Sequence, residues 1–331
     1  MAIAQKSRST PILRNKSEIT VKNTSPAINV PTQDYIHAAS SDNTRKAYQA
    51  DIRHFIQWGG LLPTTADVVL RYLQQHAAIL NPRTLLRRLT AIKQWHLYQS
   101  FADPTTHPAV KKTLTGIAHV HGQPKKKATP LTLDALITMS THLNTTSRLI
   151  DCRNAALLQA GFFGAFRRSE LVAIQWEHID FVPEGVEILI PRSKTDQAGE
   201  GAVCAIPYGD DTLCPVTTLI RWRDRSQQKT GAVFRQITKG QTIKEEGIKP
   251  NQVNIILKAI ATACGLPNPE QYSGHSLRRG FATQASKHGV PFGSIMRQGR
   301  WRHEGTVLGY MDEGQRFHQN AADLMLHPDK R

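Results

Sequence analysis

The sequence predicts a mainly helical protein of two domains, with a small antiparallel β-sheet in the second (an α+β arrangement). Apolar residues recur at helical spacing through most of the chain. The pattern changes to strict alternation at 186–190, and AVCAIP at 202–207 is a second strand candidate. A stretch bearing proline and lysine but no apolar period, 123–129, separates two helical blocks. With 331 residues, 40% of them hydrophobic, the chain can form a core in each block.

These patterns divide the chain into four parts. A basic tail without apolar periodicity comes first, and it either contacts DNA phosphates or has no role. The parts are the flexible tail (1–32), a helical domain (33–122), the linker (123–129) and the second domain (130–331).

The first domain is expected to be helical throughout. Its helices are expected over 41–58, 66–80, 82–101 and 108–119. In the third helix one stripe is expected to be buried: Leu85, Leu89, Ile92 and His96. The opposite stripe combines arginine with short polar groups: Arg83, Arg87, Thr90 and Gln94. Such a face suits a DNA groove, although an ordinary solvated helix face looks much the same.

The second domain is expected to contain five further helical segments around one β-hairpin. The helical segments are 131–143, 151–176, 214–228, 251–264 and 317–326, with more helix within 272–310. The hairpin joins 186–190 to 202–207 through a long tip.

The charge balance indicates a polyanionic partner. Lys and Arg number 42 against 26 Asp and Glu, which gives a formal charge of +16 and a pI near 9.9. Nucleic acid is the first candidate. A ribosome-associated or membrane-surface protein is the alternative, but the chain has no long lysine block and no basic amphipathic segment beside an apolar anchor. If the two domains clamp a duplex, the linker lysines Lys125, Lys126 and Lys127 would lie along the DNA backbone.

Cysteine usage and hydropathy indicate a reduced, cytoplasmic protein. The four cysteines are widely spaced and form no C-x-x-C pair, so neither a disulfide framework nor a zinc site is expected. No apolar stretch is long enough to span a bilayer, and the N-terminus lacks the apolar core of a signal peptide.

The stretch 272–310 contains the residues best suited to chemistry on a phosphate. His275 and Arg278 lie three residues apart, so on a helix beginning near Ser273 both project from one face. Tyr310, a latent oxygen nucleophile, follows Trp301 by nine residues.

Two upstream motifs complete the set. Arg167 begins R-x-S-E-L, and Lys194 lies in S-K-T at the expected hairpin tip. The order R-x-S-E-L, S-K-T, S-G-H-S-x-R, G-x-W and tyrosine resembles the tyrosine recombinase (phage integrase) family. Trp301 stands where the family more often has a second histidine. In this respect the chain is most similar to the Cre-like members. The pattern S-x-N-T-x-x-x-Y-x-x-D-x-x-x-F from Ser41 is similar to the family's helical, SAM-like core-binding domain.

The chemistry gives Arg167 and Arg278 a defined task. Displacement at a phosphodiester concentrates negative charge on the non-bridging oxygens, and two arginine forks can bind those oxygens bidentately. The attacking phenol must also lose a proton while the departing 5′ hydroxyl gains one.

The resemblance implies the remaining roles. Tyr310 forms a 3′-phosphotyrosine linkage, Lys194 protonates the leaving oxygen, and His275 assists proton movement. Trp301, which has no acid–base capacity, binds and positions through its indole N–H. The linkage retains the phosphodiester's energy, so no metal, ATP or other cofactor is expected. The chain accordingly has no P-loop and no carboxylate cluster for two-metal chemistry.

Neighbouring residues leave some ambiguity of register. Arg168 and Arg279 adjoin the two arginines, but the R-x-S-E and H-x-x-R patterns favour Arg167 and Arg278. His303 precedes Tyr310 by only seven residues, so it does not fit the second-histidine position. Glu170 is expected to orient its neighbours rather than to react.

The implied activity is site-specific recombination of double-stranded DNA by a homotetramer, in integration, excision or resolution, with helper proteins unidentified. Phe317, Ala321 and Leu324 form an apolar stripe that would dock either on a neighbouring protomer or on its own domain. Three other functions stay open: a relaxing enzyme of the type IB topoisomerase kind, a resolving enzyme for replicon ends, and a catalytically silent DNA-binding accessory protein.

Overall fold

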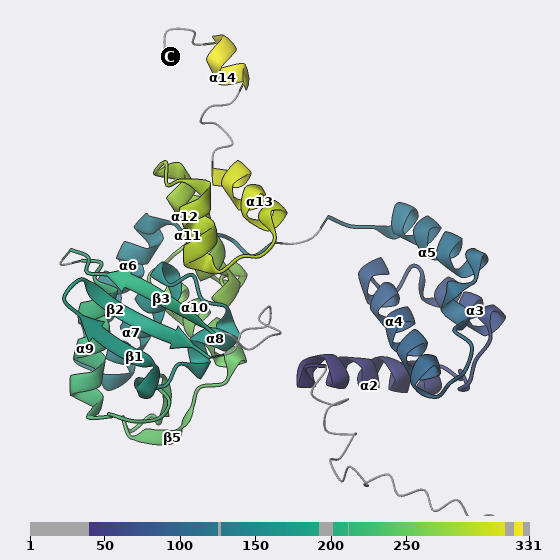
Figure 1. The fold of residues 1–331 in the computed structure, drawn as a ribbon, viewed down its shortest axis with the longest axis horizontal. Coiled ribbons are helices and arrows are strands. Elements are labelled where there is room, and N and C mark those ends of the chain that lie inside the picture. Colours follow the sequence, from purple (N-terminus) through teal and green to yellow (C-terminus); the bar gives the residue numbers. More distant parts are fainter. Residues whose placement is uncertain (1–39, 125–126, 192–200, 211, 315–320, 327–331) are drawn as a thin grey trace, which may run out of the picture. The chain divides into compact units, whose positions relative to one another are not determined.

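The chain divides into two compact units, Met1–Lys125 and Lys126–Arg331 (Figure 1). The division falls within the segment expected to be the linker. The structure, a computed structural model, describes residues 40–124, 127–191, 201–210, 212–314 and 321–326. Within those residues no helix is both long enough and apolar enough to cross a bilayer.

The first unit is a bundle of helices around one apolar core. Its helices are α2 (Asp42–Gln57), α3 (Ala66–His76), α4 (Pro82–Tyr98) and α5 (Pro108–His121), with a 3-10 turn at Pro104–Thr106. The largest buried side chains include Phe55, Tyr72, Leu73, Leu85 and Ile92. α3 ends at His76, earlier than the apolar pattern through Leu80 predicts.

The expected buried stripe of α4 is confirmed, including its histidine. Leu85, Leu89, Ile92 and His96 are all buried. His96 Nδ1 lies 2.8 Å from the Ile92 carbonyl, and His96 Nε2 accepts the Thr64 N–H at 2.9 Å. Both ring nitrogens are therefore satisfied in the core.

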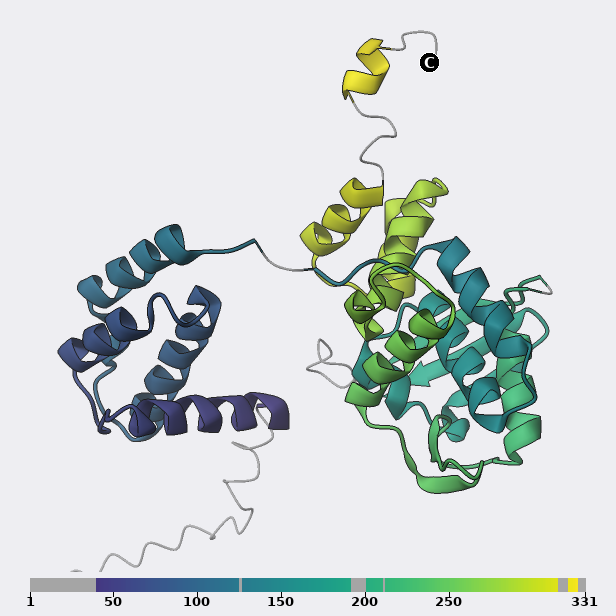
Figure 2. The same cartoon turned by 180° about the vertical axis from the view of Figure 1, so that it is seen from behind.

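The second unit surrounds one central helix, α7. Residues 152–162 of α7 are buried on every face. The helices are α6 (Leu133–Asn144), α7 (Leu149–Phe163), α8 (Arg168–Ala173), α9 (Pro215–Ser226), α10 (Pro250–Ala263), α11 (Gly274–Lys287), α12 (Phe292–Gly299), α13 (Glu304–Gly314) and α14 (Ala321–Leu326). The strands are β1 (Ile179–Val182), β2 (Gly185–Ile190), β3 (Ala202–Pro207), β4 (Arg235–Ile237) and β5 (Ile243–Gly247). The first three strands face the viewer in Figure 1, whereas helices cover the unit in the opposite view (Figure 2).

The expected hairpin is confirmed as β2 and β3, which pair antiparallel with Ile188 opposite Cys204. Val186, Ile188 and Ile190 are buried, while Glu187 and Leu189 are exposed. This is the alternation that the sequence predicts for a strand with one face on a core. The mainly helical fold with small antiparallel sheets is thus confirmed.

Three features differ from the sequence prediction. Strand β1 adds a third strand beside β2, and β4 and β5 form a separate two-stranded ribbon. The helical segment expected over 151–176 is interrupted after Phe163, and α8 begins at Arg168. The break falls at Gly164, and the next residue, Ala165, adopts a left-handed conformation with φ of 45°.

Candidate active site

Five of the six predicted catalytic residues meet in the second unit, around the start of α11. Arg167 precedes α8, His275 and Arg278 lie on α11, Trp301 follows α12, and Tyr310 lies on α13. The sixth, Lys194, lies outside the described residues. The segments that meet here are more than 140 residues apart at their extremes, from Arg167 to Tyr310.

The start of α11 is fixed by a reciprocal cap. Ser273 Oγ accepts the His275 N–H at 3.3 Å, and Ser276 Oγ accepts the Ser273 N–H at 3.0 Å. Asn254 of α10 also accepts the Gly274 N–H at 2.9 Å. These bonds satisfy first-turn donors and set the direction in which His275 and Arg278 project.

Arg278 is a buried cation with one donor group left over. Its side chain is 3% exposed, and Nη1 donates to the Ala165 carbonyl. Its guanidinium lies 4.0 Å from the centroid of the Trp301 ring. Nη2 is buried and has no hydrogen-bond partner among the described residues. Burial, helped by the charge of Arg167, lowers the pKa of Arg278 to about 9, so the group stays cationic at neutral pH.

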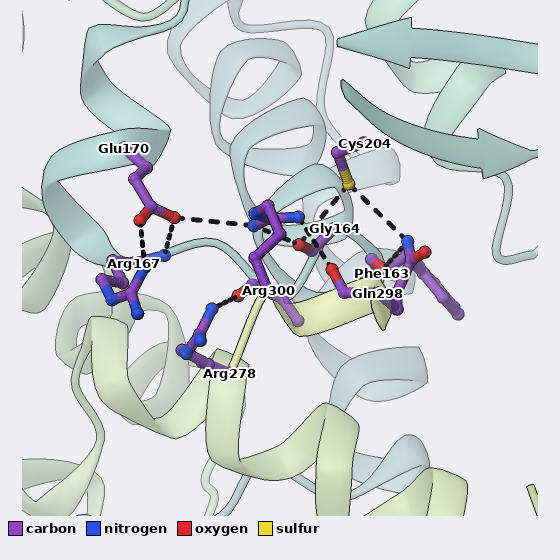
Figure 3. Close-up of polar contacts among 9 residues, drawn as sticks. Phe163, Gly164, Arg167, Glu170, Cys204, Arg278, Gln298 and Arg300 are labelled. Atoms are coloured by element: carbon purple, nitrogen blue, oxygen red, sulfur yellow. Dashed lines mark hydrogen bonds and ion pairs between the residues drawn. The ribbon is translucent and has the colours of Figure 1, made fainter. Parts of the chain in front are cut away.

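Arg167 is held by a glutamate three residues later (Figure 3). Its Nη1 lies 2.5 Å from Glu170 Oε1, and its backbone N–H donates to Glu170 Oε2 at 2.9 Å. Burial alone would raise the pKa of Glu170, but the bonds from Arg167 and the charges of Arg167 and Arg300 outweigh it. The pKa therefore lies below its ordinary value and Glu170 is ionised. This geometry agrees with the expectation that Glu170 orients its neighbours.

The hydroxyl of Tyr310 lies beside His275. The distance from Tyr310 Oη to His275 Nε2 is 3.1 Å, which is a hydrogen bond. Burial raises the pKa of the Tyr310 phenol, although the charges of Arg278 and Arg279 oppose the shift. The phenol is consequently protonated at neutral pH and needs a proton acceptor before it can attack, and His275 is within reach.

Trp301 packs between the arginine and the tyrosine. Its ring centroid is 6.3 Å from that of Tyr310 at an interplanar angle of 64°. Gly299 makes room for the indole, because a Cβ at that position would lie 1.7 Å from a ring carbon. A glycine is needed here for the close approach of the ring.

The neighbouring residues that could be confused with site residues have other surroundings. Arg279 Nε donates to Glu313 Oε2 at 2.9 Å, and its Nη1 donates to the Ala128 carbonyl. Arg279 therefore joins α11 to α13, and its guanidinium lies 5.9 Å from the centroid of the Tyr310 ring. His303 is exposed in the connection between α12 and α13.

Two residues that the sequence patterns did not single out also reach the site. Arg300 lies 3.5 Å from Glu170 and donates to the Gly164 carbonyl at 3.0 Å. Gln298 donates to the Phe163 carbonyl at 2.9 Å (Figure 3). The only local signal for Arg300 was its position next to Trp301.

The predicted DNA-binding residues are partly engaged with other groups. Arg87 makes a bidentate pair with the buried carboxylate of Asp51 at 2.8 and 2.9 Å, yet 51% of its side chain is exposed. Arg83 is exposed, and the Thr90 hydroxyl donates to the Leu86 carbonyl at 3.0 Å. Arg83 Nη1 also donates to the Gln123 carbonyl at 3.3 Å. The two arginines are thus exposed but engaged, and Thr90 is partly exposed.

Gln94 lies at a groove between α2 and α4 with a volume of about 800 Å³. Arg45, Arg53 and Trp95 line the same groove. Lys127 of the linker pairs with Glu313 at 2.5 Å, while Lys125 and Lys126 lie outside the described residues. In the part of the chain that the structure describes, no group of three or more His, Cys, Asp or Glu side chains is arranged to hold a metal ion.

The arrangement can bind and attack a phosphate. Arg278 offers a buried N–H that has no partner among the described residues, and Arg167 offers a second guanidinium. The Tyr310 oxygen lies beside a histidine that can take its proton. Preformed donors of this kind stabilise charge that develops on phosphate oxygens.

The chain is similar to known recombinases over most of its length. Residues 100–316 match the phage integrase family. Over 299 residues the chain is 35% identical to an integrase/recombinase xerD homolog of Selenomonas ruminantium, with 88% of this chain and 87% of that protein covered.

Solved structures share the fold at low sequence identity. The XerH site-specific recombinase bound to palindromic difH substrate matches with a TM-score of 0.61 and 16% identity, covering 87% of this chain and 80% of that one. The Tn1549 transposon integrase with transposon right end DNA matches with a TM-score of 0.60 and 12% identity, over 90% and 96%. A lambda integrase dimer bound to a COC′ core site matches with a TM-score of 0.58 and 16% identity, over 87% and 77%.

Proposed function

Since the chain belongs to the phage integrase family of tyrosine recombinases, we propose that it cuts and rejoins DNA strands at specific sites with Tyr310 as the nucleophile. The observation that carries this assignment is the 3.1 Å contact between Tyr310 Oη and His275 Nε2, beside the buried Arg278. The phenol thus lies near a proton acceptor, His275, and near a cation that can bind phosphate, Arg278, both in the same domain.

The reaction is a transesterification at phosphorus. Tyr310 Oη forms a bond to phosphorus as the bond from phosphorus to the 5′ oxygen breaks, which leaves a 3′-phosphotyrosine and a 5′ hydroxyl. The phenol proton passes to His275, and we assign protonation of the 5′ oxygen to Lys194 by its motif position. A 5′ hydroxyl from the partner strand reverses these steps. The number of phosphodiester bonds is unchanged, so no external energy source is required.

The arginines act on the charge of the transition state. Within the part of the chain that the structure describes, Nη2 of Arg278 is buried without a hydrogen-bond partner, so a phosphate oxygen would satisfy this donor. Arg167, fixed by Glu170, would bind a second non-bridging oxygen. Trp301 stacks against the Arg278 guanidinium and limits its movement.

Double-stranded DNA is the proposed partner, and the cytoplasm the proposed place of action. The charge of +16 favours a polyanion, and the three solved structures named above are of recombinases or integrases bound to DNA. We assign DNA contact to Arg83, Arg87, Thr90 and Gln94 on α4 and to Lys125, Lys126 and Lys127 in the linker. We also propose a homotetramer on DNA, because exchange between two duplex sites requires four strand cleavages.

A nicked suicide substrate tests the nucleophile. Cleavage close to the nick releases a short fragment, so the covalent protein–DNA adduct accumulates. Wild type should form the adduct, and Tyr310→Phe should bind the same DNA without forming it. If neither protein becomes attached under conditions of tight binding, the assignment is wrong and a DNA-binding accessory role is favoured. Relaxation of supercoils that carry no target site would instead favour a topoisomerase-like activity.

A further inference from the structure

The end of α7 and the turn that follows it are held by side chains from a distant part of the chain (Figure 3). Carbonyl groups at a helix C-terminus lack partners within the helix. Here three successive carbonyls accept hydrogen bonds from side chains of α11 and the end of α12: Phe163 from Gln298, Gly164 from Arg300, and Ala165 from Arg278. Arg167 lies only two residues beyond this turn, so the same contacts fix both arginines of the site.

Arg300 connects this turn to Glu170. One of its terminal nitrogens, Nη2, donates to the Gly164 carbonyl at 3.0 Å and lies 3.5 Å from Glu170 Oε2. Its guanidinium also lies 4.8 Å from the centroid of the Phe166 ring. The side chain is only 12% exposed, and its position is set by a left-handed backbone with φ of 54°. Nη1 donates to the Gln298 carbonyl at 2.7 Å. Both terminal nitrogens are thus engaged with protein carbonyls, while Nε is buried with no hydrogen-bond partner among the described residues.

Gln298 extends the connection to the hairpin. Its Nε2 donates both to the Phe163 carbonyl at 2.9 Å and to the Ala205 carbonyl of β3 at 3.0 Å. Lys194 lies between β2 and β3 in the sequence. One amide thus joins the turn before Arg167 to the base of the hairpin that contains the proposed acid.

We propose that Arg300 is a positioning residue for the recombination reaction, which acts together with Gln298 by fixing the α7–α8 turn and Glu170, and through them the guanidinium groups of Arg167 and Arg278. This inference rests on the proposed function. Arg300 does not contact the phosphate. It holds in place the groups that do, and a displacement of about 1 Å in such groups can slow a reaction about 100-fold.

A comparison of two buried arginines tests the proposal. Arg300→Met removes both the hydrogen bond and the charge, and Arg300→Lys retains the charge. Arg153→Met is the matched control, because Arg153 is 4% exposed and donates to the Arg235 carbonyl at 3.0 Å without touching the site. Single-turnover adduct formation on the suicide substrate gives the cleavage rate, DNA titration gives the Kd, and thermal melting gives the stability of each variant.

We expect Arg300→Met to slow cleavage by about 10- to 100-fold with the Kd changed by less than about threefold, and Arg300→Lys to recover part of the rate. Loss of the Arg300 charge also raises the pKa of Glu170. The acidic limb of the rate–pH profile should therefore move to higher pH in Arg300→Met and not in Arg153→Met. Equal losses of rate in the Met variants of both arginines, with unchanged pH profiles, would overturn the proposal.

A double-mutant cycle with Glu170→Gln keeps the test decisive if Arg300→Met is poorly folded. Because Arg300 acts through Glu170, Arg300→Lys should slow the Glu170→Gln protein less than it slows wild type. Effects that simply multiply would overturn the proposal. Absence of the adduct in wild type would be a different result, since it would remove the proposed function and this inference with it.

Discussion

At the scale of single residues, Arg278 has a buried hydrogen-bond donor that a bound phosphate could satisfy. A buried N–H without a partner destabilises a fold by about 1–3 kcal/mol, and Nη2 of Arg278 is such a group among the described residues. This loss of folding free energy is consistent with a donor that forms its hydrogen bond only when a phosphate oxygen is bound. The stacked Trp301 ring and the Ala165 carbonyl fix the rest of the guanidinium.

Replacing Arg278 by lysine should separate charge from geometry. Arg278→Lys keeps a cation but loses the planar fork that bridges two oxygens and stacks on the indole. We expect the single-turnover cleavage rate to fall by about 100-fold or more. The same change at Arg153 should leave the rate near that of wild type. A rate within about threefold of wild type in Arg278→Lys would show that charge alone suffices.

The sequence could predict the residues in the motifs, but not the residues that hold their side chains in place. Arg167, His275, Arg278, Trp301 and Tyr310 lie in short patterns whose spacing carries chemical meaning. Arg300 gains its role from Glu170 and Gly164, more than 125 residues earlier in the chain. Only the folded chain brings these groups together, so no local pattern could reveal the contact.

At the scale of elements, a small satellite core positions Tyr310, the proposed nucleophile. Ala282 of α11, Ile295 of α12 and Val307 of α13 are fully buried together, with Trp301 and Tyr310 packed against them. The ion pair of Arg279 with Glu313 adds a second attachment between α11 and α13. The position of Tyr310 relative to His275 therefore depends on how α12 and α13 pack onto α11.

Two glycines of α12 provide a matched test of this packing. A Cβ at Gly299 would overlap the Trp301 ring, whereas a Cβ at Gly293 meets no atom within 4 Å. We expect Gly299→Ala to displace Trp301 and reduce the cleavage rate by about tenfold or more. Gly293→Ala should leave the rate and the melting temperature near those of wild type, because the added methyl group meets no atom within 4 Å.

The comparison is made by single-turnover cleavage together with thermal melting. Equal rates for Gly299→Ala and Gly293→Ala would mean that the placement of Trp301 does not control the reaction.

Elements with strong periodicity were predictable, and those defined by pairing were not. The alternation in β2 follows from one buried face, and α2 and α11 begin at serine caps. Strand β5 has the polar sequence IKEEG, and β4 has only three residues. Such strands form because the neighbouring strand supplies hydrogen bonds. A short stretch of sequence carries no signal of that pairing.

At the scale of the whole molecule, each unit has its own hydrophobic core. The formal charge of +16 is the property most directly connected with a DNA partner. Binding that neutralises phosphates releases counterions, so the affinity should fall steeply with salt.

Substitutions on α4 should change this salt dependence. If Arg83 contacts a phosphate, Arg83→Ala should reduce the slope of log K against log salt by about 1. Arg71, exposed on α3, is the control, and Arg71→Ala should leave the slope unchanged. Titration of target DNA over a range of salt concentrations measures both slopes, and equal slopes would place Arg83 away from the DNA.

The central claim is that Tyr310 becomes joined to DNA, and peptide mapping of the trapped adduct tests it most directly. After nuclease and trypsin digestion, the tryptic peptide 303–316, which contains Tyr310 as its only tyrosine, should carry the nucleotide remnant. We expect mass spectrometry to place a phosphodiester on the Tyr310 oxygen. A remnant on any other residue, or an adduct that persists in Tyr310→Phe, would contradict the account.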